Sequence, residues 1–186
     1  GLILPKLSFK SKKNNRKKLK IAVVGCGGRG TGAAVQALRA DNNVELVTLA
    51  DAFKDRLETS LNAIKDEFEG EMEINIKEKN KFVGFDAYKK AIDKSDVVIL
   101  ASPPGFRPAH FEYAINKNKH VFMEKPVATD AHGVRQVLNS ARKAKEKNLN
   151  VVVGLQRRYQ KSYLSAKKQI DRGIIGKIIS AHVRWN

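Results

Sequence analysis

A glycine-rich segment, GCGGRG, places its glycines in the spacing G-x-G-x-x-G. In this spacing Gly25 permits a sharp turn, Gly27 lets the backbone approach a ligand closely, and Gly30 lets a helix pack tightly against a strand. A helix that begins at Gly28 directs unpaired N–H groups and a partial positive charge at the turn, which favours a phosphate group. Arg29 then covers that phosphate or lies in solvent. The pattern alone also suits an ordinary tight turn, so its meaning depends on the elements around it.

A carboxylate follows this motif at an informative distance. Asp51 lies 21 residues after Gly30, at the end of the apolar run VELVTLA. A carboxylate there can accept hydrogen bonds from the hydroxyls of an adenosine ribose, and it repels a 2′-phosphate. The next two residues are uncharged, although Lys54 and Arg56 are near. The combination predicts a dinucleotide site that takes NAD rather than NADP; the alternative role for Asp51 is a helix N-cap.

A polar residue and prolines follow the apolar run DVVILA. Ligands of open α/β sheets bind beyond the carboxyl ends of the strands, so Ser102 and Pro103 are predicted to form a rigid edge of the site. His110 lies in the helix expected next. It could face the cofactor, but a single helical histidine is interpreted more readily as a surface residue.

Glu124-Lys125-Pro126 directly follows another apolar run, HVFM. A lysine that is partly desolvated beside a nicotinamide has a lowered pKa and can move a proton during hydride transfer. The alternative is a surface loop that carries a charged pair. The residue types alone do not decide between these two interpretations.

The elements that position these residues alternate along the chain. Apolar, β-branched runs predict strands at 20–25, 44–50, 81–85, 96–101, 119–123 and 151–154, whereas helical patterns occupy 28–40, 53–68, 86–93, 108–118 and 129–148. Thr129 or Asp130 is expected to cap the last of these helices. Such alternation predicts an α/β fold, a Rossmann-type doubly wound parallel sheet. We assign residues 20–155 to an NAD(P)-binding domain.

The formal charge of +17 is concentrated at the ends of the chain. Residues 1–20 carry eight Lys and Arg and no acid, and residues 156–186 carry eight against one acid, Asp171. Such ends could serve a nucleic-acid binder. We favour a solvated tail and a helix separated from an acidic partner domain. No nucleic-acid partner is therefore expected.

Other compositional features narrow the class. No run approaches the ~18 apolar residues of a membrane span. The single cysteine, Cys26, excludes an internal disulfide, and no metal site is assigned. The opening GLILP is either the end of an export signal or part of a disordered basic tail over residues 1–19. The location, in the cytoplasm or exported to the periplasm after folding, stays open.

The ordered motifs GCGGRG, LADAF, ILASPP, FMEKP and VVVGLQRR resemble the Gfo/Idh/MocA family over roughly residues 20–186. The resemblance implies an NAD(P)-dependent oxidoreductase that acts on a CH–OH group of a sugar or cyclitol. It makes Lys125 the candidate catalytic residue beside the nicotinamide, with Glu124 in contact with the cofactor. Gln156 and Arg157 would lie where the chain re-enters the cofactor cleft; the alternative is a basic surface turn.

The resemblance also implies a second, α/β substrate domain. Residues 156–186 are expected to form a connecting helix and the first strand of that domain, which is incomplete here. We therefore expect this chain to bind NAD weakly and to catalyse little alone, and the full-length protein to be a homo-oligomer. Two alternatives stay open: an NAD-dependent glycosidase that oxidises its sugar transiently, and a non-catalytic regulator or nucleic-acid binder built on a Rossmann fold.

Overall fold

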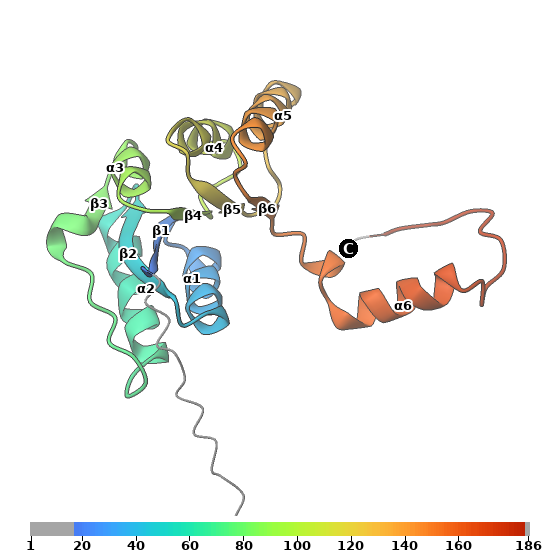
Figure 1. The fold of residues 1–186 in the computed structure, drawn as a ribbon, viewed down its shortest axis with the longest axis horizontal. Coiled ribbons are helices and arrows are strands. Elements are labelled where there is room, and N and C mark those ends of the chain that lie inside the picture. The colour runs from blue at the N-terminus through green and yellow to red at the C-terminus, as the bar shows by residue number, and fades with distance from the viewer. Residues whose placement is uncertain (1–16, 185–186) are drawn as a thin grey trace, which may run out of the picture.

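The computed structural model describes residues 17–184, so residues 1–16 of the tail expected at 1–19, and the last two residues of the chain, lie outside it. One six-stranded sheet forms the centre of the domain, and all its strands pair in parallel in the order β3-β2-β1-β4-β5-β6 (Figure 1). The strands are β1 (Leu19–Val24), β2 (Val44–Asp51), β3 (Lys81–Val83), β4 (Val97–Leu100), β5 (His120–Met123) and β6 (Val151–Val153). The order reverses between β1 and β4, where such sheets bind ligands.

Helices cover both faces of the sheet because its strands are apolar on both faces. Ile21 and Val23 of β1 belong to the core beneath α1 (Gly28–Ala40) and α2 (Lys54–Glu67). The alternate residues Ala22 and Val24 belong to the opposite core, as expected from the two-residue period of a strand. That core is closed by α3 (Ala87–Asp93), α4 (Arg107–Asn116) and α5 (Ala131–Glu146). The predicted doubly wound parallel sheet is confirmed.

Several boundaries differ from the sequence prediction. The third strand ends at Val83, two residues early, after a short 3-10 helix, η1 (Glu78–Asn80). Asp130, not Thr129, caps α5, because its side chain accepts a hydrogen bond from the Gly133 amide at 2.7 Å. These differences leave the ends of β1, β2, β4 and β5 where the site requires them.

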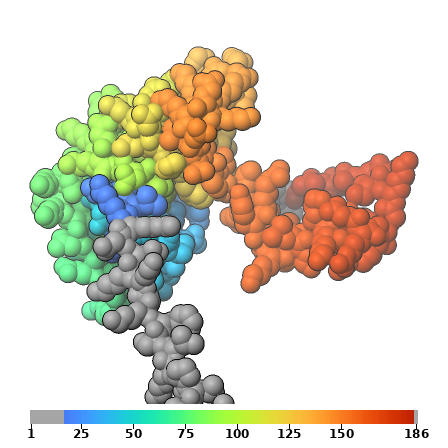
Figure 2. All heavy atoms as spheres, in the orientation of Figure 1, coloured from blue at the N-terminus to red at the C-terminus, as the bar shows by residue number. Residues whose placement is uncertain are grey.

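The segment after β6 projects away from the sheet (Figures 1 and 2). It contains η2 (Gln156–Arg158) and α6 (Lys161–Asp171), and every residue from 155 to 184 is exposed. Residues 172–184 form no strand, in contrast to the expected first strand of a second domain. A strand is stabilised by hydrogen bonds to a neighbouring strand, and within residues 17–184 no strand lies beside this segment. The described helices include none with the length and apolar character to cross a membrane.

Candidate functional site

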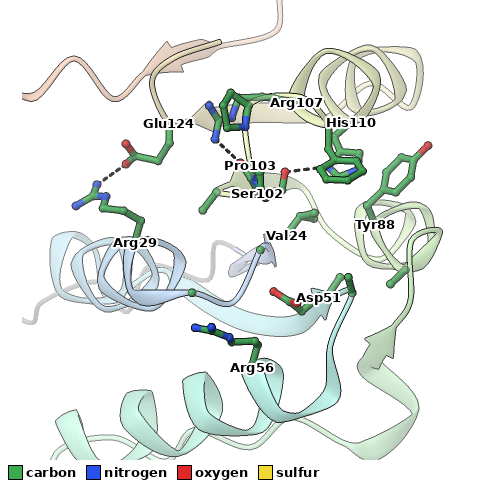
Figure 3. A pocket seen from close by; sticks show the side chains of 18 of the residues that line it. Val24, Arg29, Asp51, Arg56, Tyr88, Ser102, Pro103, Arg107, His110 and Glu124 are labelled. Carbon is green, nitrogen blue, oxygen red and sulfur yellow. Dashed lines mark hydrogen bonds and ion pairs between the residues drawn. The ribbon is translucent and has the colours of Figure 1, made fainter. Parts of the chain in front are cut away.

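A cavity of about 700 Å³ opens at the carboxyl ends of the central strands (Figure 3). Its volume lies within the usual range for small-molecule and cofactor sites. Most of the residues predicted to bind cofactor line it: Gly25, Gly27, Arg29, Asp51, Ser102, Pro103, Glu124, Lys125 and Gln156. Gly28, Gly30 and Arg157 are not among the lining residues. The fold therefore brings together segments that are about one hundred residues apart in the sequence.

The glycine turn leaves its backbone open to the cavity. Gly25 has φ +96°, and a Cβ there would lie 2.4 Å from the Ser102 nitrogen. Around Gly27 and Gly28, in contrast, a Cβ would meet nothing within 4 Å. No side chain caps the N-terminus of α1. An open backbone at an uncapped helix N-terminus fits a diphosphate, because the first-turn N–H groups can donate to it.

Asp51 is oriented by the backbone on both sides of it. One carboxylate oxygen accepts the Cys26 amide at 2.6 Å, and the other accepts the Phe53 amide at 3.0 Å. Each oxygen keeps a further lone pair, so the carboxylate can still accept hydroxyl groups from the cavity (Figure 3). Burial, and then the charge of Asp51, raise the pKa of the Cys26 thiol to about 12. Cys26 is thus a protonated packing residue of the turn.

Our interpretation of His110 as a surface residue is wrong. The side chain is buried and lines the cavity, and its Nδ1 lies 3.1 Å from the Ser102 hydroxyl. The Tyr88 ring stacks on the imidazole at a centroid distance of 4.0 Å (Figure 3). His110 lies in the first turn of α4, which already packs against the sheet. Sequence spacing alone did not reveal which residues of that first turn face the interior.

This burial makes stability depend on pH. Desolvation, aided by the charge of Arg107, lowers the pKa of His110 from 6.5 to about 4. The unfolded chain therefore binds one more proton than the folded chain between pH 6.5 and 4, so the free energy of unfolding falls as the pH drops through this window. The full difference is about 3 kcal/mol.

Urea unfolding of the parent chain and of His110→Asn across this pH range checks the prediction. The asparagine amide lies as many bonds from the backbone as His110 Nδ1, which contacts the Ser102 hydroxyl, but it does not titrate. The parent should lose more stability than the variant on acidification, and other groups cancel in the comparison. Parallel curves would contradict the assignment.

Glu124 and Lys125 form the edge of the cavity after β5. The Glu124 side chain is buried and pairs with Arg29, so an ion pair joins the start of α1 to the end of β5 (Figure 3). A Cβ at Gly154 would lie 3.0 Å from the Glu124 carboxylate, which shows how closely β6 packs behind it. Lys125 is exposed, and within residues 17–184 its ammonium forms no hydrogen bond or ion pair.

Gln156 and Arg157, which were both expected where the chain returns to the cleft, occupy different surroundings in the structure. Gln156 lines the cavity. Arg157 instead donates a hydrogen bond to the Tyr163 hydroxyl, and its guanidinium lies 4.9 Å from the centre of that ring. The basic-turn interpretation therefore describes Arg157 better than a place in the cavity.

Sequence reasoning missed most of the aromatic wall of the cavity. Phe53, Phe85 and Phe106 line it and stay exposed, and the Phe85 and Phe106 rings lie 6.0 Å apart. Large exposed apolar side chains at one place indicate a binding surface. Each follows a strand by a few residues, which is the one signal that could have identified them. Arg56 also lines this part of the cavity.

The strand order, the open glycine turn and the carboxylate at the end of the second strand define a dinucleotide-binding α/β domain. Residues 19–154 match the model of the Gfo/Idh/MocA oxidoreductase family with an NAD-binding Rossmann fold. The chain belongs to this family.

Named relatives agree with this assignment. Inositol 2-dehydrogenase from Salmonella typhimurium is 29% identical over 169 residues, which cover 89% of this chain and 45% of that protein. Among solved structures, myo-inositol 2-dehydrogenase from Lactobacillus plantarum is 31% identical with a TM-score of 0.68, covering 88% of this chain and 44% of that one. The scyllo-inositol dehydrogenase from Lactobacillus casei, solved with NAD(H) and scyllo-inositol, is 26% identical with a TM-score of 0.67, covering 87% and 43%. The chain thus spans less than half the length of these relatives.

Proposed function

We propose that this domain holds NAD in the cavity at the carboxyl edge of the sheet and serves hydride transfer with a cyclitol or sugar hydroxyl. The observation that carries the proposal is the pairing of an open, uncapped glycine turn with the oriented Asp51 carboxylate across one cavity. The turn suits a diphosphate and Asp51 suits the adenosine ribose. The charge of Asp51 opposes a 2′-phosphate, which supports NAD over NADP.

Lys125 is the proposed acid/base residue. It lies on the same cavity as Asp51 but follows β5, beyond the switch point of the sheet. Bound NAD supplies the hydride acceptor. The exposed Lys125 side chain has no competing partner within residues 17–184, and in its neutral amine form it would take the proton that leaves the substrate hydroxyl. Inositol dehydrogenases among the relatives support a cyclitol or sugar as the substrate class.

A chemical-protection experiment tests this placement. Acetylation of each lysine by acetic anhydride is followed by mass spectrometry with no ligand, with NADH, and with ADP-ribose, which has no nicotinamide. We expect saturable NADH binding by calorimetry and strong protection of Lys125 by NADH but weak protection by ADP-ribose. Lys145, an exposed residue on α5 outside the cavity, is the internal control. Absence of NADH binding, or equal labelling of Lys125 in all three samples, would contradict the proposal.

Product analysis distinguishes the reaction types. Incubation with NAD and a panel of inositols and sugars should give net NADH if the chain turns over as a dehydrogenase. Release of a sugar from a glycoside without net NADH would instead support transient oxidation. Salt-sensitive binding of unrelated DNA, together with no NAD binding, would support the regulator.

A further inference from the structure

Arg107 is a charged residue inside the wall of the cavity. It is the first residue of α4 and only 2% exposed. One terminal nitrogen of its guanidinium donates to the Pro126 carbonyl oxygen, and the other donates to the Ser102 carbonyl oxygen. Arginine is seldom buried so completely unless it is paired. Here its partners are two backbone carbonyls from the segments that follow β4 and β5. Figure 3 shows Arg107 beside Ser102, the partner that follows β4.

The burial of this guanidinium is energetically unfavourable. Desolvation lowers the pKa of Arg107, while the negative charge of Glu124 opposes that effect. The Arg107 Nε is buried and has no hydrogen-bond partner within residues 17–184. A buried donor without a partner destabilises a fold. An apolar residue would fill this position without such a cost, so the two carbonyl contacts are the feature that distinguishes arginine here.

Hydrogen bonds hold the backbone on both sides of Lys125, the lysine of the site. The Glu124 amide donates to the Leu100 carbonyl oxygen at 3.0 Å, which holds the chain just before Lys125. Arg107 holds the carbonyl of Pro126 just after it. Because the Lys125 ammonium has no partner of its own within residues 17–184, its direction depends on the backbone at these two neighbours.

We propose that Arg107 is a positioning residue that fixes the turn bearing Lys125 against the segment bearing Ser102. This inference rests on the proposed function, in which Lys125 lies beside the nicotinamide. Arg107 gives the turn a rigid brace to α4, because one planar guanidinium spans both carbonyls. Its loss frees the Pro126 carbonyl to rotate towards water and lets Lys125 move away from the position it takes over the cofactor.

The test measures how strongly NADH protects Lys125 from acetylation, and it does not depend on turnover. Arg107→Met keeps the length and apolar stem of the side chain but removes every donor, whereas Arg107→Lys keeps the charge and one donor group. In the acetylation assay we expect NADH to protect Lys125 in the parent chain, and Arg107→Met to lose most of this protection. Arg107→Lys should restore part of it. NADH affinity of each variant is measured by calorimetry, and protection is compared at a saturating NADH concentration, so that a change in affinity does not enter the comparison.

Each result has a distinct meaning. Full protection of Lys125 in a folded Arg107→Met chain that binds NADH normally would overturn the positioning role and leave the proposed function intact. No protection in the parent chain would overturn the proposed function itself. A uniform rise in labelling of all lysines, with a loss of stability in urea, would mean that Arg107 only supports the fold. If Arg107→Met does not fold, parent-level protection in Arg107→Lys would overturn the inference, since a single ammonium lacks the planar, two-nitrogen geometry with which the guanidinium holds both carbonyls.

Discussion

We expect the Gly30→Ala variant to lose NADH binding and much of its stability. A Cβ on Gly30 would lie 1.9 Å from the carbonyl oxygen of Gly25 and 3.3 Å from a methyl carbon of Val23. The first contact is with backbone, so helix α1 must move away from the strand. Overpacking of this kind costs about 1–3 kcal/mol, and it displaces the helix N-terminus from the phosphate position. Urea unfolding and calorimetric titration with NADH measure the two losses.

Gly32→Ala is the matched control on the same helix. A Cβ there would meet nothing within 4 Å, and Gly32 does not line the cavity. Alanine is the better helix former, so this variant should gain about 0.5–1 kcal/mol and bind NADH as the parent does. If Gly30→Ala bound NADH as tightly as Gly32→Ala, the glycine turn would not be the phosphate site.

Removal of the Asp51 carboxylate should weaken NAD binding by about 10- to 100-fold. Hydrogen bonds to a charged group contribute about 1.5–3 kcal/mol, and each 1.4 kcal/mol is tenfold in affinity. Asp51→Ala also leaves the Cys26 and Phe53 amides without their acceptor. Asp51→Asn keeps one side-chain oxygen but loses the charge, so it separates the electrostatic effect from the orientation of the turn.

The two cofactors should respond differently to Asp51→Asn. Its NAD affinity should fall, whereas its NADP affinity should hold or rise because the repulsion of the 2′-phosphate is gone. Asp55→Ala, which removes an exposed carboxylate in the first turn of α2, controls for the general loss of charge. Equal losses for NAD and NADP in Asp51→Asn, or an equal effect of Asp55→Ala, would contradict the ribose assignment.

The part of the site formed by the glycine turn and Asp51 could be predicted from sequence, because the residues that determine it are close together in the chain. A strand, a glycine turn, a helix, a second strand and Asp51 follow one another in order, and the geometry of a βαβ unit places them together. The strand periodicity was equally direct, since continuous apolar runs such as DVVILA are typical of strands buried on both faces.

The part of the site around His110 and Arg107 could not be predicted, because it depends on contacts between segments that are distant in the sequence. His110 is buried because Tyr88, from α3, covers its ring, and Arg107 is buried because the segments after β4 and β5 meet around it. No spacing within α4 encodes those neighbours. The expected strand near the end of the chain had the apolar residues a strand needs, but residues 172–184 lack a neighbouring strand in the described part of the chain.

The reversal of strand order between β1 and β4 divides the cleft between two consecutive lengths of chain. Everything proposed to grip the adenosine and the diphosphate comes from residues before β4, and everything proposed to govern the reacting end comes after it. Cofactor preference and reaction chemistry can therefore change independently, through substitutions in different halves of the chain, as long as the pairing of β1 with β4 is preserved. The Arg29–Glu124 ion pair is an exception, because it joins the two halves and requires its two residues to change together.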